Sequence, residues 1–219
     1  GREPDDNNQN LRYVIFGIKH PIAARRIGFG VTKGATNIST NATRFATRGE
    51  ILYGSRREQE DRGSENGAFR HTLWQATITS EFDSDIAEQA GNAHEINPSA
   101  DLSITTFTDL DKADETVDLL NNIIGREIGD KNKESDMLKL ANCVLDEFHD
   151  NGLYTATQDD NGVWHITKTQ LSDEKYTKLK GIFQNLNRNG RTQEEQKVIN
   201  SRAKQIRGIR TELLKGPKY

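Results

Sequence analysis

The sequence predicts a mostly α-helical domain built around a helical hairpin at residues 65–96, with one small β-hairpin and a long C-terminal helix. Apolar residues recur at three- and four-residue spacing in most segments, and capping residues stand at the ends of these segments. One pair of segments alternates instead. LYTATQ and VWHITKTQ flank the turn sequence DDNG, which is typical of a β-hairpin over residues 153–169.

The composition fits one folded domain of modest apolar content. Hydrophobic types make up 33% of the 219 residues, and 18 glycines add to them, slightly below the usual ~45–50% for such a count. No run approaches the ~18 apolar residues of a membrane span, and the N-terminus lacks a signal-peptide pattern. We therefore expect no transmembrane segment, a disordered leader or linker over residues 1–10, and a single domain over residues 11–219.

Cysteine and charge narrow the function classes. The single Cys143 excludes an internal disulfide framework and a Cys-rich zinc site. The net charge of −3 is unevenly spread: residues 81–136 carry 15 acidic and 4 basic side chains, whereas residues 171–219 carry 5 acidic and 12 basic. Such asymmetry indicates either a polyanion-binding tail or two segments that attract each other.

The N-terminal half predicts short helices separated by loops. Residues 11–28 are apolar enough for a helix that Pro21 bends or restarts. Residues 29–63 are rich in Gly, Ser, Thr, Asn and Arg, which predicts loops with a short helix at residues 37–48. In residues 65–96, two segments of helical spacing meet at a cap supplied by Asp83 or Ser84.

The C-terminal half predicts four more helices. Each begins at a polar residue suited to capping: Asp114, Ser135, Ser172 and Thr192. Thr192 and Glu195 form a capping-box pattern for the last helix, which reaches Leu214. This basic amphipathic helix suits a solvated face, a partner contact or a nucleic-acid contact.

The spacing of two histidines predicts a polar cluster. His71 and His94 lie at equal distances from the expected turn near residues 82–83, so in an antiparallel hairpin they face each other. Packed helices lie ~8–10 Å apart, which lets two inward-facing imidazoles reach a shared ligand. The predicted site therefore contains Arg70, His71, His94 and Glu95.

A second helix offers supporting residues. Glu115, Asp118 and Asn122 share one helix face because they are spaced by three and four. Asn121 and Asn122 interrupt an apolar stretch, and such local conflicts tend to mark functional sites. With Arg126 four residues beyond Asn122, the supporting set is Asp118, Asn121, Asn122 and Arg126.

Three chemistries suit this set. The two histidines as acid and base, with Arg70 on the phosphate, suit metal-free phosphodiester cleavage. Alternatively His71, His94 and Asp118 hold a divalent metal that activates water, or Glu95 serves as a general acid. A purely structural role for both pairs also fits, since no recognised metal motif such as H-E-x-x-H occurs.

The other three histidines predict structural roles. His20 precedes a proline and suits a loop or a helix end. His149 stands at the end of a helix, where a cationic imidazole complements the helix dipole. His165 alternates with Trp164 in the hairpin and is expected on the sheet surface.

Three stretches resemble a known family. NGAFRHTLWQATITSEF, GNAHE and ADETVDLLNNIIGREIG, within residues 66–129, are similar to a segment of the C-terminal toxin tips of bacterial polymorphic toxins, of the Rhs-repeat and contact-dependent growth inhibition type. The resemblance carries over to seven positions: Arg70, His71, Trp74, His94, Glu95, Asn121 and Asn122, with Trp74 as a packing residue.

The resemblance implies a secreted antibacterial effector. Such a domain is joined to a larger N-terminal delivery scaffold, enters the cytoplasm or periplasm of a target bacterium, and is neutralised by a cognate immunity protein. We expect a hydrolase, and first a nuclease; a phospholipid or peptidoglycan hydrolase of the cell envelope is the alternative, and a non-enzymatic binding or membrane-active module a third. The acidic residues 81–136 weaken the nuclease hypothesis, because they repel nucleic acid unless a metal bridges the two.

Overall fold

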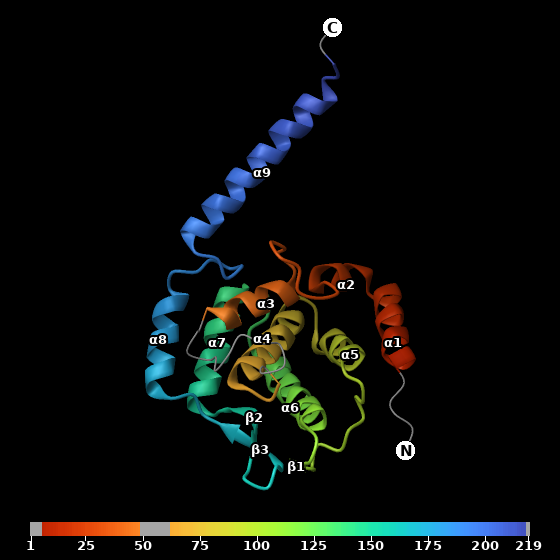
Figure 1. The fold of residues 1–219 in the computed structure, drawn as a ribbon, viewed down its shortest axis with the longest axis vertical. Helices are drawn as coiled ribbons and strands as arrows, with labels where there is room; N and C mark the ends of the chain where they lie inside the picture. The colour runs from red at the N-terminus through yellow and green to blue at the C-terminus, as the bar shows by residue number, and fades with distance from the viewer. Residues whose placement is uncertain (1–5, 49–61, 218–219) are drawn as a thin grey trace.

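Helix α4 (Glu65–Glu81) lies at the centre of the molecule and is surrounded by other helices (Figure 1). The computed structural model describes residues 6–48 and 62–217. Of the 17 residues of α4, 13 are buried. Four helices pack against it: α3 (Ile38–Thr47), α5 (Ser84–His94), α6 (Leu110–Lys131) and α7 (Met137–Asp150). The predicted mostly α-helical fold is confirmed.

Helix α6 (Leu110–Lys131) lies along α4 at very short range. A Cβ atom added at Gly125 would lie 2.5 Å from the carbonyl oxygen of Thr72, and one at Gly129 would lie 2.5 Å from that of Ala76. Both glycines fall on the same face of α6, since they are four residues apart. Only glycine permits this approach, and the approach sets the position of the site described below.

The remaining helices of the body lie around α4 and α6. They are α1 (Asp6–Lys19), α2 (Pro21–Ile27), α3 (Ile38–Thr47), α5 (Ser84–His94), α7 (Met137–Asp150) and α8 (Asp173–Phe183). Helices α3, α5 and α7 pack against α4, whereas α1, α2 and α8 pack on these outer helices. Pro21 starts a new helix, as predicted. The large fully buried side chains include Phe45, Phe69, Phe148 and Phe183, contributed by α3, α4, α7 and α8.

The predicted leader over residues 1–10 is wrong in part. Residues 6–10 belong to α1, while residues 1–5 lie outside the described residues. The polar start of α1 is ordered by tertiary contacts: Gln9 donates to the carbonyl oxygen of His94, and Arg12 donates to those of Asn92 and Glu95.

Helix boundaries follow caps that the sequence predicted closely but not always to the residue. Asp83 caps α5 by accepting from the Ile86 amide, as predicted. Helix α6 begins at Leu110 rather than Asp114, because Asp109 supplies an earlier cap. Asp136, rather than Ser135, caps α7.

The β-sheet is antiparallel, with strand order β1-β3-β2. The predicted hairpin consists of β2 (Leu153–Gln158) and β3 (Trp164–Thr169), and the two-residue β1 (Thr106–Phe107) was not predicted. The Asp159 carboxylate accepts from the amides of Asn161 and Val163 and so closes the turn.

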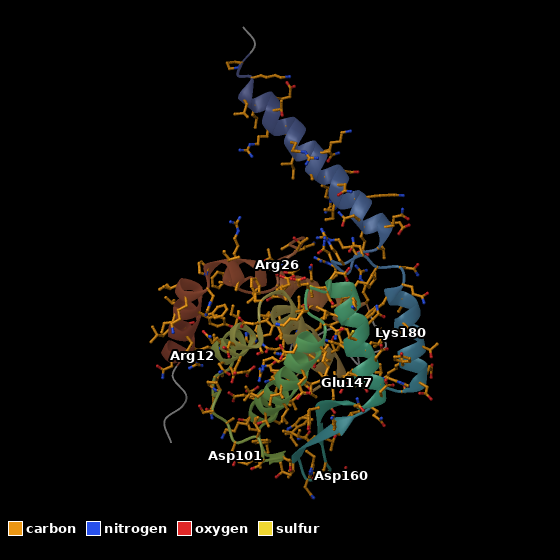
Figure 2. The ribbon with its side chains drawn as sticks, turned by 180° about the vertical axis from the view of Figure 1, so that it is seen from behind. Arg12, Arg26, Asp101, Glu147, Asp160 and Lys180 are labelled. Atoms are coloured by element: carbon orange, nitrogen blue, oxygen red, sulfur yellow. The ribbon has the colours of Figure 1, made fainter. Side chains whose placement is uncertain are left out.

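The last helix, α9 (Gln193–Leu214), projects from the body (Figure 1). The capping box of Thr192 and Glu195 is present, and Arg48 pairs with Glu195 at 2.5 Å. None of residues 193–214 is buried, and Figure 2 shows their side chains pointing outward along the helix. The helix therefore extends away from the acidic middle region.

No helix in the described residues combines the length and the apolar character needed to cross a membrane, in agreement with the prediction from composition.

Candidate functional site

The centre of the site joins α4 to α6. His71 lies in the second turn of α4 and Asp118 in the third turn of α6, and His71 Nε2 is 3.2 Å from Asp118 Oδ2. Both side chains are buried. The close contact at Gly125 holds the two helices together next to this pair, because it involves Thr72, the residue that follows His71.

Glu95 joins this pair from α5. It is the C-cap residue of α5 and its backbone is extended (φ −88°, ψ 146°). The residue is 6% exposed, and its Oε1 atom has no hydrogen-bond partner among the described residues. One ligand atom from each of His71, Glu95 and Asp118 lies within 4.8 Å of the other two, so the three side chains could hold a metal ion.

The electrostatics of the cluster favour a bound cation. Burial, followed by the charges of Glu115 and Asp114, raises the pKa of Glu95 to about 8. Burial and the neighbouring carboxylates also raise the pKa of Asp118 well above its usual range, and burial raises that of Asp114 to about 6. Grouped carboxylates repel one another, and a divalent cation would relieve this repulsion.

The two histidines come together as the spacing predicted. Their ring centroids are 5.9 Å apart. Burial first, and then the charge of Arg70, lowers the pKa of both His71 and His94, so that both imidazoles are neutral at pH 7. His94 also lies 5.7 Å from the Trp74 ring, and its Nδ1 atom is 2.6 Å from the hydroxyl oxygen of Tyr13.

A pocket of about 310 Å³ opens beside the histidines. Tyr13, Arg70, His71 and His94 contribute its charged and titratable lining. Most of the remaining wall is apolar and comes from α1 to α5 and the loop after α2, including Phe16, Ile27, Phe29, Val31, Trp74 and Ala93. Glu95 and Asp118 lie behind His71 rather than in the pocket wall, so the pocket reaches the cluster through this histidine.

Helix α1 contributes to the site in a way that the sequence did not predict. Tyr13 contacts His94, and Arg12 donates to backbone carbonyls at the end of α5. The available signal was the pair Arg12-Tyr13 within an otherwise apolar segment. The partners of these two residues lie about 80 residues away in the sequence, so the pair alone did not indicate which residues it contacts.

The other predicted site residues divide between two roles. Asn122 lies against Gly91 of α5, and its Oδ1 atom is buried without a hydrogen-bond partner among the described residues. Asn121 instead exchanges two hydrogen bonds with the backbone of Tyr154 and fastens β2 to α6. Arg126 donates to Gln75, one turn beyond His71, and does not line the pocket.

The metal ligands predicted from the sequence overlap in part with the group that could hold a metal ion. His71 and Asp118 are in both sets, whereas this group contains Glu95 and not His94. The reason is that the Nδ1 atom of His94 is directed to Tyr13, while the extended backbone at Glu95 brings its carboxylate inward.

The three remaining histidines lie outside this cluster. His20 contacts Gln89, and His165 contacts Asp159 in the hairpin. His149 stands at the end of α7 between Asp150 and Asp173, and hydrogen bonds from it to these carboxylates raise its pKa. These positions agree with the structural roles predicted for them.

A family model described as a domain of unknown function, DUF6973, matches residues 28–151. The chain belongs to this family. The matched range contains Arg70, His71, His94, Glu95 and Asp118, and it leaves out α1, α2, β2, β3, α8 and α9. No curated protein and no solved structure matches the chain.

Proposed function

We propose that this DUF6973 domain is a metal-dependent hydrolase that cleaves phosphodiester bonds and acts as an antibacterial toxin domain. The observation that carries the proposal is the convergence of His71, Glu95 and Asp118 from three helices, with a buried Glu95 oxygen that lacks a hydrogen-bond partner in the described residues. A buried polar atom without a partner is costly, and bound ions are one explanation for such atoms.

The donor set suits a divalent metal. One imidazole nitrogen and two carboxylate oxygens are common ligands of zinc and manganese, with open positions left for water. Ligand atoms of one ion bond it at ~2.0–2.2 Å, so the cluster needs small side-chain rotations to close around an ion. A bound metal would supply an activated water at neutral pH.

The residues around the cluster have complementary roles in this proposal. The Arg70 guanidinium binds the phosphate oxygens and stabilises the charge that develops on them. His94 accepts or donates a proton at the ring nitrogen that does not face Tyr13. If no metal binds, His71 and His94 remain as an acid–base pair in which Asp118 orients His71, as in the metal-free alternative.

Metal analysis of the purified protein is the decisive experiment. We expect about one divalent ion per chain, loss of hydrolysis of bis(p-nitrophenyl) phosphate in chelator, and recovery on adding Zn²⁺ or Mn²⁺. His71→Ala and Glu95→Gln should lose both metal and hydrolysis while remaining folded. His165→Ala, outside the cluster, is the matched control. Full hydrolysis by metal-free protein would exclude the metal, and folded His71→Ala and Glu95→Gln variants with wild-type rates would exclude the site.

The toxin role rests on the resemblance of residues 66–129 to polymorphic toxin tips. It is tested by producing the domain in the bacterial cytoplasm or directing it to the periplasm, with and without His71→Ala. Toxicity confined to one compartment identifies where the substrate lies, and a cognate immunity protein should suppress it. Equal growth of wild type and His71→Ala in both compartments would contradict the role.

The pocket changes the order of the substrate hypotheses. Nucleic acid was the first expectation and an envelope lipid the alternative. The wall of the pocket is mainly apolar, and the basic α9 projects away from the body, so neither forms a cationic groove for a polynucleotide. An apolar pocket with an arginine and two histidines at one side suits an amphiphile with a phosphate group.

A further inference from the structure

An apolar surface runs across α1, α2 and the loop that follows α2. Its members project into solvent: Ile18 is 76% exposed, Ile22 78% and Phe29 82%, and Leu11, Val14, Ile15 and Val31 are also exposed. We call these seven residues the apolar ridge. In α1 they fall at positions 11, 14, 15 and 18, one helix face, while Tyr13 and Phe16 face the body.

The segments that carry the ridge are basic, although Arg26 of α2 is paired with Glu81 of α4. Residues 7–48 contain seven Lys and Arg and no Asp or Glu, although the whole chain has a net charge of −3. Lys19, Arg25 and Lys33 are exposed on the same segments as the ridge. A helix with exposed aliphatic residues and basic neighbours is typical of segments that lie in the interface of an anionic membrane.

The ridge is continuous with the pocket. Phe29 and Val31 belong to the ridge and also line the pocket. The neighbouring Gly28 and Gly30 line the pocket as well. The loop after α2 is therefore both part of the exposed apolar surface and part of the pocket that His71 and His94 line. A molecule held against the ridge has a short apolar route to Arg70 and His94.

We propose that the ridge docks this domain on an anionic phospholipid bilayer and that the substrate is a phospholipid drawn from it. The claim that the ridge docks on a bilayer is argued from the ridge and its basic neighbours alone. The claim that the substrate is a phospholipid rests on the proposed function. The acyl region lies along the apolar wall, and the phosphodiester group reaches Arg70. In hydrolysis the water oxygen bonds to phosphorus, one P–O bond breaks, and the released alcohol oxygen takes up a proton.

A bilayer fits this surface better than a protein partner does. Protein interfaces combine apolar contacts with a polar rim of both donors and acceptors. The ridge instead has basic side chains on its own segments and no carboxylate within residues 7–48. That arrangement complements a surface of negative charge above an apolar interior.

Vesicle co-sedimentation of the full chain tests whether the ridge docks on a bilayer, with chelator present so that hydrolysis plays no part. Wild type should bind phosphatidylglycerol-containing vesicles and bind pure phosphatidylcholine at least tenfold more weakly. Ile18→Glu combined with Ile22→Glu should weaken binding by more than tenfold, and Lys19→Gln by roughly fivefold. Ile104→Glu, at a 46% exposed position before β1 and outside the ridge, should bind as wild type does.

Several outcomes would overturn the proposal. Equal binding to both vesicle types, no binding, or equal loss in the Ile104→Glu control excludes an anionic bilayer. A wild-type dimer in light scattering that Ile18→Glu/Ile22→Glu converts to a monomer assigns the ridge to self-association. The two proposals fail separately: vesicle binding without hydrolysis of bis(p-nitrophenyl) phosphate rejects the hydrolase, whereas hydrolysis of this soluble diester without vesicle binding rejects the docking.

Discussion

Gly125→Ala tests whether the close contact of α4 and α6 sets the geometry of the site. The new methyl group would lie 2.5 Å from the Thr72 carbonyl oxygen, 2.8 Å from Gln75 Cβ and 3.2 Å from the Ala76 amide nitrogen. Two of these atoms are backbone, so side-chain rotation cannot remove the overlap. An ordinary contact begins at 3.4 Å, and the helices must therefore separate by about 0.9 Å at this point.

The cost follows from two opposing effects. Overpacking of a well-packed interior costs ~1–3 kcal/mol and sometimes more, whereas replacing glycine by alanine inside a helix gains ~1 kcal/mol. Because the overlap is with backbone, we expect the upper part of the range and a net loss of about 2 kcal/mol. For a chain of 219 residues this lowers Tm by roughly 4–8 °C, at ~2–4 °C per kcal/mol.

The same movement reaches the site. Thr72 follows His71 in α4, so a shift of α4 lengthens the 3.2 Å distance from His71 Nε2 to Asp118 Oδ2. A displacement of ~1 Å can cost ~100-fold in rate. We therefore expect metal affinity and hydrolysis to fall much more steeply than stability does, with the variant still folded at 25 °C.

Thermal melts with a matched glycine control provide the measurement. Gly181 is an exposed position within helix α8, and apart from the backbone of the helix itself no atom of the described residues lies within 4 Å of an added Cβ. Gly181→Ala should raise the stability by up to ~1 kcal/mol and leave metal binding unchanged. If Gly125→Ala behaves like Gly181→Ala in both measurements, the contact does not position the site and the reasoning is refuted.

Three further predictions concern single side chains. Since burial and nearby carboxylates raise the pKa of Glu95 from 4.5 to about 8, metal-free wild type should lose stability as pH rises between these values; Glu95→Gln should flatten this slope in urea unfolding. Asn121→Ala should cost ~1–3 kcal/mol in urea unfolding by removing both bonds to Tyr154, with kcat/KM per folded molecule unchanged. The hydrogen bond from Arg48 lowers the pKa of Glu195 to about 2. The stability that this pair contributes, and that Arg48→Ala removes, should therefore be present above pH 4.5 and lost as the pH falls toward 2. Because the pair is partly exposed, this contribution should stay below ~1 kcal/mol.

Much of the fold could be predicted because its signals are local. Helical spacing and capping residues identified the helices, and the turn sequence after Gln158 identified the hairpin. The short strand β1 escaped prediction, since two residues display no period. The start of α1 was misassigned because its order depends on carbonyl groups about 80 residues away, which no local pattern encodes.

The sequence predicted which residues gather at the candidate site, but not the orientation of their side chains. Equal spacing from the turn brought His71 and His94 together, and helical spacing placed Asp118 on the inner face of α6. Which side chains converge on Asp118 depended on the backbone at Glu95 and on the contact of His94 with Tyr13. Asn121 shows the opposite case, because a buried amide that looks functional in the sequence serves to hold a strand.

The projecting helix α9 gives the molecule two regimes of local unfolding. Its first turn is fixed through Glu195 to Arg48, but residues 193–214 bury no side chain. Most of the stability of a helix in a protein comes from tertiary packing. Because α9 buries none of its residues, it should open without disturbing the body. The amide hydrogens of α9 should exchange with solvent within seconds to minutes, whereas those of α4 should exchange only through global unfolding. A protease should therefore remove α9 and leave the pocket intact.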